Sequence, residues 1–343
     1  MHHIDHIRLH KTSLDMRWAI LRCMREWFWQ QHFIEVETPI ILGLPGQEPY
    51  LSPMELTVHN EQGRAFSAYL HTSPEYTLKK MLAAGYTNIF SLTKTFRDYE
   101  SFGGTHNPEF TMIEWYRTNA TIVDLMNDVE QLMRQVCSYI GQHYPEQQER
   151  LEFINLPQGI RRVSMKELWQ ETIQINLDEY LTTESLYTLS ISKGYHPQKE
   201  ERYEDVFYRI FLNEIEPRLS SMGVVMLHHY PAQMAALSRL SPDDSRYAER
   251  VEVYIDGIEL ANGFSELTHA QEQRDRLVRE QQHRKELGKT VYPIDEEFIA
   301  AVQQLPSCAG IALGVDRLVQ LVTGCKNIND VLVLPMSRMV DSV

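Results

Sequence analysis

Residues 109–117 constrain the fold of this chain more than any other segment. In a β-strand, their period of two places four side chains on one face: Phe110, Met112, Glu114 and Tyr116. Residues 89–97 form a second strand, and the loop between the two contains two glycines, so residues 88–117 predict a β-hairpin. This face offers an aromatic plate for a flat base and a carboxylate and a phenol for an ammonium group. The alternative is a half-buried strand whose glutamate faces solvent.

A second hairpin is predicted over residues 251–262, with Asp256 and Gly257 as a two-residue turn. This register sets Tyr254 opposite Glu259 and Glu252 opposite Ala261, so the two glutamates lie diagonally on one face. Two like charges held there suit Mg²⁺, which keeps part of its water shell and bridges to phosphates. The alternative is that both glutamates face solvent. Strict alternation turns Asn262 and Glu266 to the other face, unless a bulge at Gly263 redirects them.

The segment 310–317 predicts a third strand followed by a helix. Gly310, Ala312 and Gly314 alternate with larger apolar residues, which leaves one face bare for a ligand to approach the backbone. Arg317 follows at the start of the helix, where the helix dipole adds to its attraction for anions. Arg97 ends the first strand of the first hairpin, where it can meet a phosphate. The alternative for the glycines is tight packing alone.

The remaining segments predict helices and one edge strand. A helix over residues 12–31 begins with the Thr12 and Asp15 capping-box spacing and leads into a strand over residues 33–39, a combination common at dimer interfaces. Ser73 is the expected N-cap of a helix that runs through Met81. Residues 145–225 are polar and uneven, and we interpret them as an insertion without assigned chemistry. The whole chain, 1–343, is therefore predicted to be one α+β domain with an antiparallel sheet flanked by helices.

Charge and cysteine usage narrow the function. The chain has 33 Lys and Arg against 47 Asp and Glu, a net charge of −14, which argues against broad contact with a phosphate backbone such as that of tRNA. Four dispersed cysteines without a Cys-x-x-Cys pair fit a reducing cytosol. With no signal-peptide pattern and no long apolar run, we expect a cytoplasmic protein without a membrane segment.

Taken together, these segments resemble the class II aminoacyl-tRNA synthetases, specifically the lysine branch. Residues 33–39 resemble motif 1, residues 96–114 motif 2 and residues 310–317 motif 3. The strings Asn-Pro-Glu-Phe-Thr-Met-Ile-Glu and Asn-Gly-Phe-Ser-Glu-Leu are highly specific. The resemblance implies the class II catalytic fold, ATP and Mg²⁺ as cofactors, and a homodimer formed through the motif 1 region.

The resemblance also implies roles for individual residues. On the nucleotide, Arg97 would hold the α-phosphate, Arg317 the γ-phosphate and Phe110 the adenine, with His106 beside them and Glu100 in place of the usual motif 2 glutamate. Arg97 and Arg317 would thus be the catalytic residues. Glu252 and Glu259 would be the Mg²⁺ ligands. On the amino acid, Glu75 would take the amine nearer the carboxylate, and Asn262 would take the carboxylate. The side-chain ammonium would meet Glu114, Tyr116 and Glu266.

Within this branch, the chain resembles the elongation factor P (R)-β-lysine ligase family. About a dozen residues precede the motif 1 helix, too few for the anticodon-binding domain of lysyl-tRNA synthetases. Ala312 stands where the synthetase pattern has glycine and the ligase family alanine, and its methyl group would reshape the amino-acid pocket. The loop over residues 98–105 is one residue longer than the family pattern and lacks its arginine.

This resemblance implies an ATP-dependent ligase. It would activate (R)-β-lysine or lysine as an aminoacyl-adenylate and transfer it to a lysine side chain of elongation factor P. One alternative is tRNA aminoacylation or α-lysine activation. Another is a catalytically silent paralogue that binds lysine or nucleotide.

Overall fold

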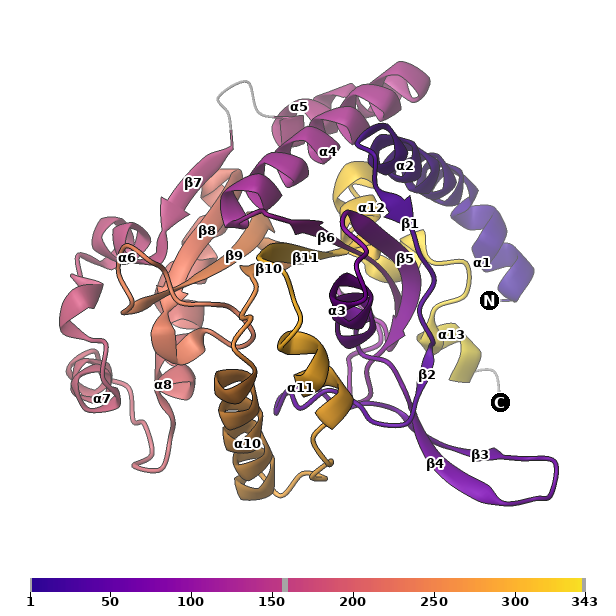
Figure 1. Ribbon diagram of the computed structural model, residues 1–343. Helices are drawn as coiled ribbons and strands as arrows, with labels where there is room; N and C mark the ends of the chain where they lie inside the picture. The colour runs from indigo at the N-terminus through magenta and orange to yellow at the C-terminus, as the bar shows by residue number, and fades with distance from the viewer. Residues whose placement is uncertain (1, 156–159, 341–343) are drawn as a thin grey trace.

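The computed structural model describes residues 2–155 and 160–340 and is built around an eight-stranded sheet (Figure 1). In spatial order its strands are β1 (Ile34–Glu35), β5 (Ile89–Phe96), β6 (Glu109–Thr118), β11 (Cys308–Gly314), β10 (Ile258–Ser265), β9 (Tyr247–Ile255), β8 (Val224–Pro231) and β7 (Arg161–Ser164). The α+β class and both hairpins are confirmed. All central pairings are antiparallel, as predicted, but the edge pairs β1–β5 and β7–β8 are parallel, so the sheet is mixed. Each parallel pair is joined by a long connection that contains helices, as parallel strands require.

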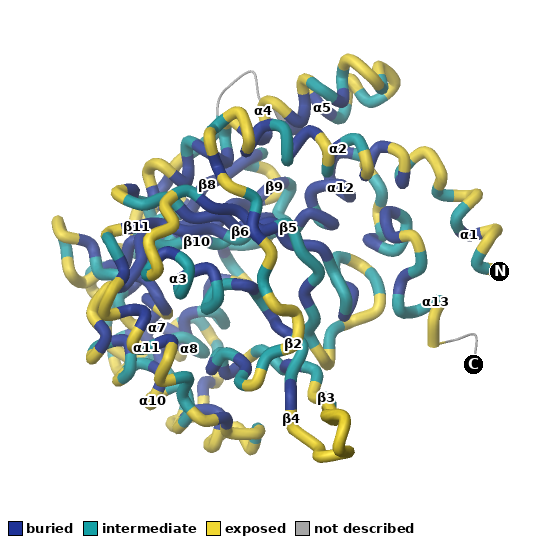
Figure 2. The backbone as a smooth tube through the Cα atoms, turned by 45° about the vertical axis from the view of Figure 1, so that its right-hand side comes forward, coloured by how far each residue is buried: buried dark blue, intermediate teal, exposed yellow. Residues whose placement is uncertain are grey.

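Helices cover both faces of the sheet. One face packs against α2 (Lys11–Gln30), α4 (Ile122–His143), α5 (Gln148–Asn155) and α12 (Val315–Thr323). The opposite face packs against α3 (Glu75–Ala83), α10 (Ala270–Glu286) and α11 (Glu296–Val302). Beside β7 to β9 lie α6 (Met165–Ile173), α7 (Thr183–Ser192), α8 (Tyr203–Ile210) and α9 (Glu216–Leu219). Short helices near the ends of the chain are α1 (His3–Leu9) and α13 (Met336–Val340). Figure 2 shows the central strands as the most continuously buried part of the chain.

A separate small sheet stands away from the main one. It contains β2 (Ile41–Leu42), β3 (Glu55–His59) and β4 (Ala65–Leu70), and the β3–β4 hairpin projects from the body with an exposed tip (Figures 1 and 2). Among the described residues, no helix is long and apolar enough to cross a membrane.

Two predicted helix starts are wrong by about one residue. The predicted capping box at Thr12 does not form, because α2 begins at Lys11 directly after α1 and the carbonyl of His10 accepts the N–H of Leu14. Pro74, not Ser73, is the N-cap of α3; the Ser73 hydroxyl still accepts the N–H of Glu75 at 3.1 Å.

A buried ion pair links α2 to the start of α12 and, through Asp316, to β6. Arg17 contacts Asp316 at 2.5 Å, and both side chains are almost fully buried. The other carboxylate oxygen of Asp316 accepts the backbone N–H of Thr111 in β6 at 2.9 Å. This linkage sets the start of α12, and with it Arg317, at a fixed position beside β6.

Candidate active site

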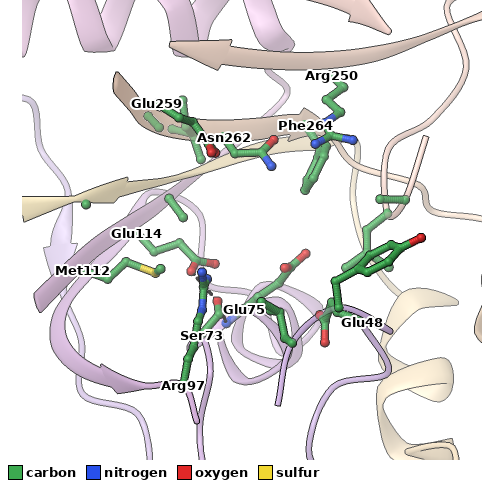
Figure 3. A pocket seen from close by; sticks show the side chains of 18 of the residues that line it. Glu48, Ser73, Glu75, Arg97, Met112, Glu114, Arg250, Glu259, Asn262 and Phe264 are labelled. Atoms are coloured by element: carbon green, nitrogen blue, oxygen red, sulfur yellow. Dashed lines mark hydrogen bonds between the residues drawn. The ribbon is translucent and has the colours of Figure 1, made fainter. Parts of the chain in front are cut away.

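A cavity of about 770 Å³ lies between the sheet and the layer that contains α3 and α10. Eleven of the thirteen predicted site residues line it: Glu75, Arg97, Glu100, His106, Phe110, Glu114, Tyr116, Glu259, Asn262, Ala312 and Arg317. Figure 3 shows the carboxylates of Glu75 and Glu114 facing the same space as the Asn262 amide. The cavity lining does not include Glu252 or Glu266, which are buried next to it.

A β-bulge determines which residues of β10 face the cavity. Tyr254 is opposite Glu259, as predicted, but the register shifts between Glu259 and Ala261, so Glu252 faces Asn262 and not Ala261. The bulge thus lies at Leu260 and not at Gly263. It places Glu252, Asn262, Ala312 and Glu114 in one row across four strands. Ala312 therefore lies directly between the amide and the carboxylate predicted to hold opposite ends of an amino acid.

At one end of the cavity, Glu114 lies among hydrogen-bond donors. The hydroxyl of Ser73 donates to one carboxylate oxygen at 2.6 Å and that of Tyr116 to the other at 2.8 Å. Burial and the nearby charge of Glu75 nevertheless raise the pKa of Glu114 to about 7. An ammonium group bound here would relieve both the burial cost and the repulsion.

Lys79 is the main residue of this end that the sequence analysis missed. Its ammonium group is buried and contacts Glu75 and Glu266 at 2.6 Å each. Glu266 was expected to meet a substrate ammonium, but Lys79 holds one of its oxygens. Burial raises the pKa of Glu266 to about 8. The spacing of Glu75 and Lys79, four residues apart on a helix, was a signal for the first contact.

The three carboxylates of Glu75, Glu114 and Glu266 thus have one resident cation between them. Glu48, which also lines the cavity, adds a fourth carboxylate close to Glu75, so acidic groups outnumber the one lysine here. The amine end of the cavity therefore matches a ligand with two ammonium groups.

At the other end of the cavity, basic and aromatic side chains gather around the motif 2 loop. The guanidinium of Arg97 lies 5.1 Å from the ring centre of Phe110. Arg317 donates to the carbonyl of Glu259 at 2.6 Å and lies 3.0 Å from Nε2 of His106. Burial and Arg317 lower the pKa of His106, so the ring is neutral near pH 7 and accepts this bond. Glu100 lies 3.9 Å from the same imidazole.

The face of β11 that was predicted to be bare is only partly so. A Cβ at Gly310 would lie 2.1 Å from the ring of Tyr116, so this glycine accommodates the tyrosine and not a ligand. At Gly314 the nearest atom would be Cδ of Arg317 at 3.7 Å, so the backbone there is open. A ligand can therefore approach the backbone of β11 only at the end of the strand next to Arg317.

The predicted Mg²⁺ ligands differ in accessibility. Glu259 lines the cavity, and burial together with the charge of Glu252 raises its pKa to about 7. Glu252 accepts hydrogen bonds from Tyr230 and Tyr254 at 2.6 Å each and from Arg250 at 2.5 Å. No group of three or more His, Cys, Asp or Glu side chains in the described chain is arranged to hold a metal ion by itself. The mutual repulsion of this pair fits a divalent cation that takes its remaining ligands from phosphates and water.

Known proteins are similar to this chain over almost its full length. Residues 4–338 match the family described as tRNA synthetases class II (D, K and N). The chain is 35% identical over 331 residues to a protein of Proteus mirabilis named elongation factor P--(R)-beta-lysine ligase, covering 95% of this chain and 96% of the relative. A relative with the same name in Pectobacterium atrosepticum is 36% identical over 329 residues, again covering 95% and 96%.

The chain belongs to the elongation factor P (R)-β-lysine ligase family, within the class II tRNA synthetases. Another relative of that name, from Salmonella paratyphi B, is 35% identical over 331 residues, with 95% of each chain covered. Membership in this ligase family confirms the resemblance to an ATP-dependent ligase of the class II type.

Proposed function

We propose that this protein activates (R)-β-lysine with ATP and transfers it to a lysine side chain of elongation factor P. The observation that carries the proposal is the charge distribution of the cavity. Three carboxylates with one lysine at one end match a diamino acid, and Arg97 with Arg317 at the other match a polyphosphate. The names of the relatives support elongation factor P as the acceptor.

The first step forms the adenylate. The substrate carboxylate, held by Asn262, attacks the α-phosphorus of ATP, and the bond from that phosphorus to the pyrophosphate oxygen breaks. Arg97 stabilises the charge that develops on the α-phosphate, and Arg317 holds the leaving pyrophosphate. Phe110 stacks on the adenine after Arg97 turns from its ring to the phosphate. Because Glu75 and Glu114 hold the amines, the carboxylate is positioned for attack in line with the leaving group.

The second step forms an amide. The acceptor ammonium loses a proton to become a nucleophile, and its nitrogen attacks the adenylate carbonyl carbon. The carbon–oxygen bond to AMP breaks, AMP leaves, and the nitrogen releases a second proton. No covalent intermediate on the protein is required.

Glu259 and Glu252 are the proposed holders of Mg²⁺, which would neutralise phosphate charge when bound. Glu259 already faces the cavity. Glu252 is positioned beside it by the hydroxyls of Tyr230 and Tyr254.

We expect the chain to be one catalytic domain that forms a homodimer through the motif 1 region, because several large apolar side chains are exposed there: Leu9, Trp18, Trp29, Ile34 and Ile41. The four free cysteines support a reducing cytoplasmic location. The net charge of −14 argues against tRNA as the acceptor.

ATP–pyrophosphate exchange tests the activation step. We expect exchange that depends on β-lysine, is weaker with α-lysine and is lost in Arg317→Ala. Exchange that prefers α-lysine and is accompanied by tRNA charging would favour a lysyl-tRNA synthetase. Tight amino-acid binding without any exchange would indicate a silent paralogue.

A further inference from the structure

One side of the cavity is lined by α8 and α10 and has no role in the activation step. Glu204 and Tyr208 come from α8, and Gln273, Arg276, Leu277, Arg279 and Glu280 come from α10. Their spacings of three and four residues mean that each helix turns one continuous face to the cavity. We call this part of the cavity, lined by these seven residues, the α8–α10 channel.

Two carboxylates of the channel have counter-charges nearby but none in direct contact among the described residues: Arg202 lies near both, Arg250 near Glu204 and Arg279 near Glu280. Burial, and next the charge of Glu280, raise the pKa of Glu204 to about 7. Oε2 of Glu280 is buried and has no hydrogen-bond partner in the described part of the chain. Neither side chain forms an ion pair within 4.0 Å with the described lysines and arginines. These carboxylates are therefore held close together in a setting that favours a cation.

The buried amide of Gln273, near the start of α10, is independent evidence for a ligand. Gln273 is 0% exposed, and both Nε2 and Oε1 lack hydrogen-bond partners among the described residues. Buried polar atoms almost always have partners, so an amide without them in a cavity wall marks a place that a polar ligand reaches. Gln273 lies seven residues before Glu280, a rise of about 10 Å along the helix.

The channel leads to the reacting groups. Tyr208 lies one helical turn after Glu204. It is close to Arg250, and the charge of Glu259 contributes to the raised pKa of its hydroxyl. Arg250 and Glu259 both border the space that the adenylate would occupy (Figure 3). Between the polar groups, Leu277 and Tyr208 provide apolar surface for methylene groups. The channel thus fits a primary ammonium on an aliphatic stem.

We propose that the α8–α10 channel binds the acceptor lysine side chain, with Glu204 and Glu280 receiving its ammonium group. This inference rests on the proposed function. A free diamino acid has the same chemistry, but the carboxylates around Lys79 already provide sites for its two ammonium groups. The channel also gives a role to α8, which belongs to the segment 145–225 that sequence analysis left without chemistry.

The test separates the two half-reactions in the double variant Glu204→Gln/Glu280→Gln. The matched control is Asp275→Asn/Glu297→Gln, which removes two exposed carboxylates outside the cavity. Exchange of ATP with pyrophosphate reports activation of the free amino acid and also reports folding. Transfer of β-lysine to elongation factor P reports use of the acceptor.

We expect the KM for elongation factor P to rise about tenfold or more in the channel variant, because the variant loses hydrogen bonds between charged groups and the acceptor ammonium. Its KM for β-lysine in exchange should stay near that of the control. The adenylate should still react normally with hydroxylamine, a small nucleophile that is uncharged at neutral pH. Unchanged acceptor KM would overturn the inference, and so would an equal rise in the β-lysine KM, which would make the channel a route for the free amino acid. Absence of exchange in the unsubstituted protein would instead refute the proposed function.

Discussion

Replacing Lys79 with methionine tests the charge balance of the amine end. Lys79 is 1% exposed and bridges Glu75 and Glu266 at 2.6 Å each, so its loss leaves the buried Glu266 and the partly buried Glu75 without a counter-ion. Breaking a buried ion pair in this way costs about 3–5 kcal/mol. Lys80→Met is the matched control, because Lys80 pairs with Asp295 at the same 2.6 Å but is 36% exposed. We expect that variant to lose about 0–1 kcal/mol.

The cost of Lys79→Met should also grow with pH. The raised pKa of Glu266, about 8, means that its carboxyl is protonated in the folded wild type at pH 6 and ionised well above pH 8. Without Lys79 it must keep its proton, whereas in the unfolded chain it is ionised throughout this range. For each pH unit above 8, the free energy of unfolding of the variant therefore falls by up to about 1.4 kcal/mol more than that of the wild type.

Urea unfolding followed by tryptophan fluorescence at pH 6 and pH 9 measures both effects. The reasoning is refuted if Lys79→Met is no less stable than Lys80→Met, or if the difference between wild type and Lys79→Met is the same at both pH values.

Three further predictions concern the site itself. Ala312→Gly should narrow the preference for β-lysine over α-lysine by about 1–3 kcal/mol, measured as the ratio of kcat/KM values in exchange; an unchanged ratio would remove Ala312 from specificity. Glu114→Gln should raise the KM for the diamino acid about tenfold or more with little change in kcat. Because the pKa of Glu114 is raised to about 7, the KM of the wild type should increase as the pH falls below 7, and the pH dependence should weaken in Glu114→Gln. Removal of divalent cations with EDTA should abolish exchange and Mg²⁺ should restore it; exchange that survives EDTA would exclude the proposed role of Glu259 and Glu252.

Local patterns were enough to predict the strands that carry the site. Alternation in residues 109–117 and the Asp256-Gly257 turn predicted both hairpins, because side-chain period and turn chemistry act over a few residues. The same patterns placed Tyr254 opposite Glu259 correctly. Adding the family resemblance identified most of the residues that line the cavity.

Features that depend on distant contacts could not be predicted in the same way. The bulge at Leu260 changes the partner of Glu252, and no local signal marks it. Lys79 reaches Glu266 across 187 positions of sequence, and Tyr116 fills the space above Gly310 from a neighbouring strand. In each case packing between separate elements decides which groups meet.

Intact-mass analysis of elongation factor P tests the central claim most directly. The acceptor would be incubated with this protein, ATP and Mg²⁺, and with either (R)-β-lysine or α-lysine. We predict the addition of one β-lysyl group to one lysine side chain, with release of AMP, and less modification with α-lysine. An unmodified acceptor under conditions in which the same preparation charges tRNA with lysine would contradict the account.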